Sequence, residues 1–370
     1  MKSQNLIKNE KKMYNLIDLF CGCGGITQGY SQTNRINVVG AIDFNQAACN
    51  TYKLNFSDAN VICCDIKEEK VEETKFNQVD IIVGGPPCQG FSALNRHNKN
   101  LEDDLRNVLF LQYIRFVKEL SPKAIMIENV RQILTQKDGF ARKTICQMLN
   151  DLGYNVSYKV LNAAEFGVPQ KRMRAFIVGI KKEIGEFDFS VIDKYKVMNY
   201  TTVDEALSDL YNLEENKNES ISSYTLTSTY KSKYIEKMHD NTGIISNHLI
   251  KYPNVNVQKR INYVPSGGNW KNVPEELFPS QRNNRHSNYM RRLDRNGQSI
   301  TIDTGHDVYF HPIYNRVPTV RESARIQSFP DKFIFTGTRA EQLKQVGNAV
   351  PPMLAEVVAK GILEVLDNEK

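Results

Sequence analysis

Long hydrophobic runs are missing from this chain of 370 residues. No stretch of about 18 apolar residues occurs, and a helix shorter than that does not cross the hydrocarbon core of a membrane. The first residues, MKSQNLIKNEKK, are polar and rich in lysine, and no apolar segment of the kind found in secretory signals follows them. From these absences we expect a cytoplasmic protein with no membrane partner.

Metal-binding patterns are missing too. The chain has seven cysteines, all within its first 150 residues, and no histidine before His97. Cys21 and Cys23 form a Cys-x-Cys pair, but no second pair stands at the spacing of a zinc site. An odd number of cysteines without a secretory signal favours free thiols over disulfides. We therefore expect no metal and no disulfide framework.

Internal repeats and low-complexity tracts are also absent, and neither sign of charge is in large excess. The net charge of +6 permits a nucleic-acid partner without requiring one. Basic residues do gather between Gln281 and Asn296, where a single acid accompanies five arginines: Arg282, Arg285, Arg291, Arg292 and Arg295. Taken alone, this cluster is as consistent with a solvated surface as with a binding face.

The first half of the chain alternates short apolar runs with helical patterns. Apolar runs at 14–20, 38–43, 79–85 and 123–128 are typical of buried strands, and helical patterns begin near Ile26 and cover 44–56 and 105–120. This alternation indicates right-handed crossovers, so we expect an α/β fold with a doubly wound, mostly parallel sheet. Ligands of such sheets bind beyond the carboxyl ends of the strands.

The length of the chain favours two lobes, and its composition changes along the way. Residues 186–316 are rich in Asn, Ser, Tyr and Lys with weak periodicity, and regular patterning returns at 319–329 and 351–366. We expect one domain formed by residues 1–185 and 317–370, which holds the sheet, and a second, smaller and irregular domain formed by residues 186–316.

A glycine-rich turn, DLFCGCGGITQG, follows the first predicted strand. Its glycines allow a sharp turn and a close approach of the backbone to a ligand, although Thr27 departs from the G-x-G-x-x-G pattern. Taken alone, the segment is equally well a tight strand-to-helix turn. Asp43 ends the next strand 21 residues after Gly22, at the spacing where an acid meets ribose hydroxyls.

The charges near this turn distinguish between ligands. Asp18, Asp43 and Asp65 lie in this neighbourhood, and the turn contains no Lys or Arg. A pyrophosphate tolerates such a setting poorly, whereas the ribose and the cationic sulfonium of S-adenosylmethionine suit carboxylates. We therefore rank S-adenosylmethionine ahead of NAD, and a nicotinamide-dependent oxidoreductase is the alternative that this ranking leaves open.

Cys88 stands in a stiff setting, IIVGGPPCQGFS, directly after the third strand. Pro86 and Pro87 fix the path of the backbone, which is useful if the sulfur must meet a reacting atom accurately. A thiolate is the strongest side-chain nucleophile available near neutral pH. We interpret Cys88 as a nucleophile, and most of the other cysteines as small packing residues.

Three further polar residues stand at strand ends. Glu128 ends the strand at 123–128, where a buried carboxylate is costly unless it is paired or used. Protonated, it can donate to a ring nitrogen; ionised, it can accept from an exocyclic amine. Arg172 and Arg174 are two residues apart and so lie on one side of an extended strand. Taken alone, these arginines are better explained as a surface pair that caps a sheet edge.

Six blocks, in this order, carry a resemblance: DLFCGCGG, GGPPCQGFS, ENV, QKRMR, RESARIQSFPD and QVGNAVPP. The chain resembles the cytosine-C5 DNA methyltransferases of bacterial restriction–modification systems. The blocks span residues 18–352, so the resemblance covers nearly the whole chain. One departure is visible, because Asp43 and Phe44 stand where many relatives have Glu and Trp.

The resemblance implies a role for each matching residue. Cys88 would add to C6 of a target cytosine, and Glu128 would bind N3 and the amino group. Arg172 and Arg174 would orient the base and steady Glu128 and the bound intermediate. The implied cofactor contacts are Asp18, Phe20, Gly22, Gly24, Gly25, Asp43, Phe44, Asp65, Ile66, Pro86, Asn348 and Ala349. The implied DNA contacts are Gln89, Ser92, Arg282, Arg285, Arg291, Arg292 and Arg295, and residues 186–316 become a target-recognition domain.

The implied activity is sequence-specific methylation of C5 in a cytosine of double-stranded DNA, with S-adenosyl-L-homocysteine as the product of the donor. C5 is a poor nucleophile until a thiolate has added to C6, and a stacked base must first be rotated out of the duplex. The resemblance further suggests an enzyme that protects DNA beside a cognate restriction endonuclease. We expect a monomer, because an asymmetric two-lobed enzyme can enclose its substrate without a partner. Alternatives are a tRNA cytosine-C5 methyltransferase of the same fold and a catalytically inactive DNA-binding relative.

Overall fold

A seven-stranded sheet forms the larger lobe of the computed structural model, which describes residues 12–87, 105–215, 221–223, 232–240, 242–278, 289–303 and 309–369. The strands are β1 (Tyr14–Leu19), β2 (Ile36–Asp43), β3 (Asn60–Cys63), β4 (Ile81–Gly84), β5 (Ala124–Val130), β6 (Tyr154–Asn162) and β7 (Met173–Lys181). Their order is β3-β2-β1-β4-β5-β7-β6, and β7 alone runs antiparallel to its neighbours β5 and β6. The predicted doubly wound, mostly parallel sheet is confirmed.

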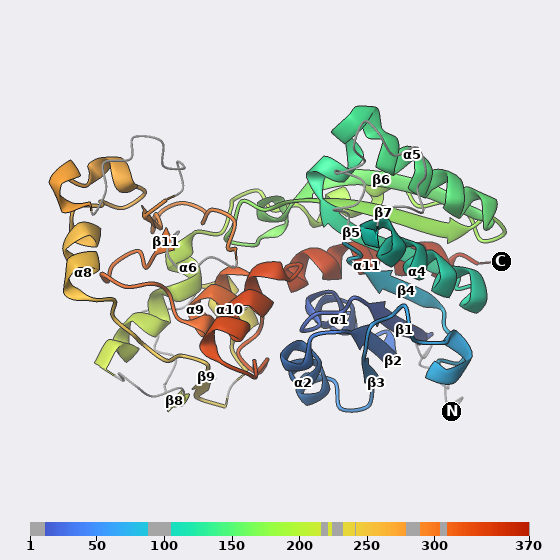
Figure 1. Ribbon diagram of the computed structural model, residues 1–370, viewed down its shortest axis with the longest axis horizontal. Helices are drawn as coiled ribbons and strands as arrows, with labels where there is room; N and C mark the ends of the chain where they lie inside the picture. Colours follow the sequence, from blue (N-terminus) through green and yellow to red (C-terminus); the bar gives the residue numbers. More distant parts are fainter. Residues whose placement is uncertain are drawn as a thin grey trace, which may run out of the picture.

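Helices cover both faces of this sheet (Figure 1). They are α1 (Gly25–Ser31), α2 (Gln46–Asn55), α4 (Leu105–Leu120), α5 (Gln136–Asp151) and α11 (Pro352–Asp367). Side chains alternate between the faces along each strand, so in β4 Ile81 and Val83 pack with α1 and α11, whereas Ile82 packs with α4 and α5. Both faces are therefore buried, which explains why the strands read as continuous apolar runs.

The last helix of the chain packs against the first. A Cβ atom on Gly29 of α1 would lie 2.3 Å from the carbonyl oxygen of Pro352, and one on Gly25 would lie 2.6 Å from that of Val350. Both distances are far below van der Waals contact, so only glycine fits at these positions. Two of the glycines in the turn segment thus serve the packing of α1 against the C-terminal segment.

The smaller lobe lies at the other end of the molecule and holds shorter elements (Figure 1). Its helices are α6 (Val203–Leu207), α7 (Lys233–Met238), α8 (Val255–Asn262), α9 (Val320–Ile326) and α10 (Arg339–Asn348). Its strands form an antiparallel pair, β8 (Ile221–Ser223) with β9 (Ile244–Ser246), and a parallel pair, β10 (Arg291–Arg292) with β11 (Tyr309–Phe310). Short 3-10 segments in the two lobes are Val71–Thr74, Arg131–Leu134, Ala163–Phe166, Phe189–Tyr195, Ser208–Glu215, Trp270–Asn272 and Glu275–Leu277.

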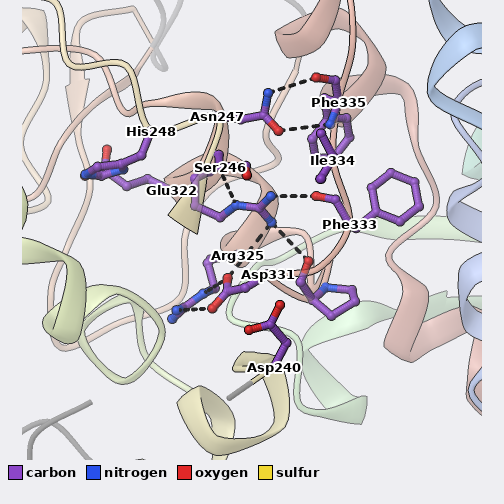
Figure 2. Close-up of polar contacts among 12 residues, drawn as sticks. Asp240, Ser246, Asn247, His248, Glu322, Arg325, Asp331, Phe333, Ile334 and Phe335 are labelled. Atoms are coloured by element: carbon purple, nitrogen blue, oxygen red, sulfur yellow. Dashed lines mark hydrogen bonds and ion pairs between the residues drawn. The ribbon is translucent and has the colours of Figure 1, made fainter. Parts of the chain in front are cut away.

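Buried arginines of α9 hold this lobe together. Arg325 donates from Nε to Asp331 (2.6 Å) and from Nη2 to Asp209 (3.0 Å), and its side chain is fully buried. Arg321 donates to the carbonyl oxygens of Ser246 and Pro330, each at 3.0 Å. Figure 2 shows the contact of Arg325 with Asp331. It also shows the side-chain amide of Asn247, which donates to the carbonyl oxygen of Phe335 and accepts from its backbone amide. The RESARIQSFPD block therefore supplies the polar framework of the smaller lobe.

The predicted division at residues 185 and 316 stays a prediction, and two packing facts bear on it. Phe189 and Ile192 lie in the same apolar cluster as α11, on the sheet side. Ala324 of α9 and Leu343 of α10 lie in the same apolar cluster as Val203 of α6. The apolar packing thus favours a first boundary beyond residue 192 and places α9 and α10 with the smaller lobe.

Candidate active site

A cavity of about 800 Å³ opens at the carboxyl ends of the parallel strands. It is lined by the glycine turn after β1, the ends of β2 and β3, the segment after β4, the end of β5 and one side of α10. Predicted site residues that line it are Phe20, Gly22, Gly25, Asp43, Phe44, Asp65, Ile66, Glu128, Asn348 and Ala349. The fold therefore brings together residues that are more than 300 positions apart in the sequence.

The glycine turn presents its backbone to this cavity. Gly22 has a φ of 53°, which favours glycine, and a Cβ atom there would meet nothing within 4 Å. Gly24 has a φ of 94°, and a Cβ atom there would lie 2.6 Å from the ring of Phe56. Gly22 is thus open to a ligand, whereas Gly24, which does not line the cavity, is required by packing behind the turn.

The carboxylate of Asp43 is held by the backbone on both sides. The amide of Gly22 donates to Oδ2 at 2.9 Å, and the amide of Asn45 donates to Oδ1 at 2.8 Å. Burial raises the pKa of Asp43, and these backbone donors oppose the rise. The acid is therefore fixed beside the turn, with lone pairs left over for hydroxyl donors of a ligand.

Apolar side chains and a second acid, Asp65, line the part of the cavity beside Asp43. Phe20, Ile66 and the largely exposed ring of Phe44 offer flat or apolar surfaces. Asp65 forms an ion pair with Lys67 at 3.0 Å and also accepts from the backbone amide of Lys67 at 3.1 Å. Burial raises the pKa of Asp65, but the contacts with Lys67 together outweigh burial and lower the pKa overall.

Asp18 does not line the cavity but lies behind the turn. It is fully buried and accepts a hydrogen bond of 2.7 Å from the hydroxyl of Thr27, which is itself 2.8 Å from the hydroxyl of Tyr52. Burial raises the pKa of Asp18 to about 7, against the hydrogen bond from Thr27. The geometry favours a role in supporting the turn over direct contact with a ligand.

Pro86 is also buried behind the cavity wall, where its carbonyl oxygen accepts a hydrogen bond of 2.8 Å from Asn129. Asn129 is largely buried, and its own oxygen accepts from the backbone amide of Val130. The end of β5 is thereby tied to the segment that leads from β4 toward Cys88. This role of Asn129 is not apparent from the sequence, although the residue stands inside the ENV block.

Glu128 lies at the end of β5 and forms an ion pair with Arg174 of β7, at 2.9 Å between Nε and Oε1. The two strands are antiparallel neighbours, which is why residues 46 positions apart meet. Burial raises the pKa of Glu128, and the charges of Arg174 and Arg172 oppose the rise. The predicted association of Glu128 with an arginine is present.

Arg172 is fully buried and supports the site from one side. Its guanidinium donates to the carbonyl oxygens of Ile302 (2.9 Å), Gly347 (2.8 Å) and Ala349 (2.9 Å). Burial lowers the pKa of Arg172, and the nearby charge of Arg174 acts in the same direction. Arg172 thus ties the start of β7 to the end of α10, which forms a wall of the cavity.

The remaining predicted residues fall into two groups. Cys88, Gln89, Ser92, Arg282 and Arg285 lie outside the described residues. Of the arginine cluster, Arg292 is buried and donates to several carbonyl oxygens, including those of Val264 (2.6 Å) and Ile261 (2.9 Å), so its geometry favours a structural role over contact with DNA. Arg295 forms a half-exposed ion pair with Asp204 at 2.8 Å. Arg291 lies in β10 and is partly exposed.

Within the described part of the chain, no cluster of three or more His, Cys, Asp or Glu side chains is arranged to hold a metal ion. Over the same residues, no helix combines the length and the apolar character that a membrane crossing needs.

Comparison with known proteins agrees with this arrangement. The family described as C-5 cytosine-specific DNA methylase matches residues 14–364. Type II methyltransferase M1.HphI of Haemophilus parahaemolyticus is 34% identical, over 95% of this chain and 87% of its own length. Type II methyltransferase M.DdeI of Desulfomicrobium norvegicum is also 34% identical, over 96% of this chain and 89% of its own length.

Solved structures show the same fold. One is an Escherichia coli protein provisionally described as a DNA modification methyltransferase encoded within a prophage. It superposes with a TM-score of 0.77 at 30% identity, over 96% of this chain and 99% of its own. The Dnmt2 methyltransferase of S. pombe, at 16% identity and a TM-score of 0.61, shares the fold over 96% of this chain and 99% of its own. The chain belongs to the C-5 cytosine-specific DNA methylases and is a DNA (cytosine-5-)-methyltransferase.

Proposed function

We propose that this enzyme transfers the methyl group of S-adenosyl-L-methionine to C5 of a cytosine rotated out of duplex DNA, through a covalent adduct with Cys88. We further propose that it protects DNA as part of a type II restriction–modification system, as the names of its relatives suggest. We also propose that a cognate endonuclease acts at the same DNA sequence and that this methyltransferase works as a monomer.

The observation that carries this proposal is one continuous cavity. It is lined by Asp43 and Asp65 at the ends of β2 and β3, and also by Pro87 and Glu128 beyond β4 and at the end of β5. In the strand order β3-β2-β1-β4-β5 these ends span about 20 Å, from four steps of about 4.8 Å each. That length accommodates a nucleoside donor and a pyrimidine ring side by side.

The residues present fit the donor. Asp43 would accept from the ribose hydroxyls, Asp65 would accept from the adenine amino group, and Phe20, Phe44 and Ile66 would contact the adenine faces. Bound there, the donor supplies an electrophilic methyl group on a sulfonium. The carboxylates of the cavity complement its positive charge.

The chain's own residues would then carry out four steps. The thiolate of Cys88 forms a bond to C6 of the cytosine, and the electron pair displaced from the C5–C6 bond makes C5 nucleophilic. Glu128 stabilises this adduct by hydrogen bonds to N3 and the amino group. C5 takes the methyl group, and the electron pair of the broken sulfur–carbon bond stays on sulfur, which gives S-adenosyl-L-homocysteine. C5 then loses its proton to a base, the C5–H electron pair re-forms the C5–C6 double bond, and Cys88 leaves as a thiolate.

The geometry around Glu128 suits this role. Burial raises the pKa of Glu128 against the charges of Arg174 and Arg172, and Arg174 holds the side chain in place at 2.9 Å. Arg172 acts indirectly, because its hydrogen bonds fix the backbone of Gly347 and Ala349 at the donor side of the cavity. We therefore assign Arg172 a positioning role and Glu128 a catalytic role.

DNA contact would come from the segment after Cys88 and from the smaller lobe. Gln89 and Ser92 would lie next to the rotated base, and Arg282, Arg285, Arg291 and Arg295 would contact phosphates or base edges. Arg292 is left out because its guanidinium is engaged with carbonyl oxygens inside the lobe.

Bisulfite sequencing tests this function. DNA from cells that express the chain should contain cytosines protected from conversion within one short sequence, and DNA from cells without it should not. Purified enzyme should label duplex DNA and leave transfer RNA unlabelled in the presence of a radioactive methyl donor. Labelling of transfer RNA instead of DNA, or unprotected cytosines throughout, would refute the proposal.

A further inference from the structure

The donor's sulfur carries three groups, and the cavity offers a separate wall for each. In the proposed function, the adenosine contacts Asp43 and Asp65, and the methyl group must face the cytosine near Glu128. The third group is the aminocarboxylate end, which carries one positive and one negative charge. The wall that remains is α10 with the residues that follow it, from Glu341 to Val350.

This wall lies directly against the glycine turn. The thiol of Cys23 donates to the carbonyl oxygen of Gln345 at 3.7 Å, and a Cβ atom on Gly25 would lie 3.0 Å from the Cβ atom of Ala349. On its other side, Thr336 before α10 donates to the carbonyl oxygen of Ala47 at the start of α2. A donor whose ribose contacts Asp43 therefore has α10 within reach of its aminocarboxylate.

Most ionisable side chains that line the cavity already have partners. Asp65 pairs with Lys67, Glu128 pairs with Arg174, and Asp43 accepts from two backbone amides. Glu341 and Lys344 differ. They are three residues apart on α10, hence neighbours on its surface, and neither forms an ion pair within the described part of the chain.

Glu341 is also fixed in position. Its Oε2 accepts from the backbone amide and the hydroxyl of Thr338, each at 2.7 Å, as the third residue of a capping box, so Oε1 is left for a ligand. The same hydrogen bonds from Thr338 lower the pKa of Glu341, which keeps the carboxylate charged near neutral pH. The anchored anion Glu341 and the flexible cation Lys344 thus lie side by side on the remaining wall.

We propose that Lys344 binds the carboxylate, and Glu341 the ammonium, of the donor's aminocarboxylate end. The inference rests on the proposed use of S-adenosylmethionine and adds two cofactor-binding residues to it. The two charges match the two charges of the ligand in number and sign. They would also select against adenosine derivatives that lack the amino-acid end.

Calorimetric titration with S-adenosylhomocysteine tests the assignment. Lys344→Gln should weaken binding by about tenfold, the effect of one charge-assisted hydrogen bond. Glu341→Gln, which keeps an oxygen for the capping box, should weaken binding by about three- to tenfold. Lys53→Gln, which changes an exposed lysine of α2 that does not line the cavity, is the matched control and should bind as the wild type does.

Two analogues separate the roles. Lys344→Gln and the wild type should bind decarboxylated S-adenosylhomocysteine with the same affinity. Glu341→Gln and the wild type should likewise bind the deaminated analogue with the same affinity. Equal losses with all ligands, or a Lys344→Gln variant that loses affinity for DNA but not for S-adenosylhomocysteine, would overturn the assignment. Failure of the wild type to bind S-adenosylhomocysteine would overturn the proposed function as well, so the two failures are distinguishable.

Discussion

Replacing Cys88 with serine should reduce methyl transfer by at least about a thousandfold. A serine hydroxyl is almost entirely protonated at neutral pH, so it would not add to C6, and C5 would stay too weak a nucleophile to take the methyl group. The measurement is the initial rate of transfer of a radioactive methyl group to duplex DNA that contains the methylated sequence.

The matched control is Cys146→Ser, which changes a half-buried thiol of α5, outside the cavity. It should keep a rate near that of the wild type. The Cys88→Ser enzyme should still bind S-adenosylhomocysteine normally, because Cys88 would contact the base and not the donor. A Cys88→Ser enzyme that retains more than a few percent of the wild-type rate would contradict the mechanism.

Replacing Arg325 with methionine should lower the free energy of unfolding by about 3–5 kcal/mol, the usual cost of removing one partner from a buried ionic network. Arg325 is fully buried and contacts two carboxylates, Asp331 at 2.6 Å and Asp209 at 3.0 Å. Without the guanidinium, both acids would lose the cation that bridges them in the interior of the smaller lobe, while Asp331 would keep its longer contact of 3.9 Å with Arg321. Urea denaturation followed by circular dichroism measures the change.

Arg295→Met is the control for this effect, because Arg295 also pairs with an aspartate, Asp204, at 2.8 Å. That pair is partly exposed to solvent, and such pairs contribute less than about 1 kcal/mol. Similar losses for the two variants would show that burial of the Arg325 network does not determine its contribution.

The sheet and the place of the site follow from local sequence patterns. Buried parallel strands require continuous apolar runs, and residues directly after such runs must gather at one edge. Phe20, Asp43 and Glu128 could therefore be assigned to one site from the sequence. Resemblance to a known family added Asn348 and Ala349, which no local pattern connects to that edge and which the fold brings to the cavity.

Other features depend on packing that no local pattern shows. β3 and α5 were not predicted: β3 has four residues, and α5 is interrupted by left-handed backbone at Lys137, Asp138 and Gly139. Burial is equally hidden in the sequence. Asp18 stands three residues before Cys21 in the turn segment, yet it is buried behind the wall of the cavity. Arg292 and Arg295 are both arginines of one cluster, yet Arg292 is buried and donates to carbonyl oxygens inside the smaller lobe.

Lys344 and Glu341 could not be predicted as site residues for a related reason. Both are charged residues on the exposed side of an amphipathic helix, a pattern that most helices of soluble proteins share. Their importance arises only because α10 is brought against the glycine turn, through the contact of Cys23 with Gln345 and the hydrogen bonds of Arg172.

In the proposed mechanism, the sulfur of Cys88 bonds covalently to the target cytosine. The most direct measurement uses a duplex in which 5-fluorocytosine replaces that cytosine, incubated with enzyme and methyl donor, because fluorine at C5 cannot leave as a proton does. Mass spectrometry of the digested complex should find the oligonucleotide attached to the peptide that contains Cys88. No attachment, or attachment at another residue, on a duplex whose normal form is methylated would contradict the account.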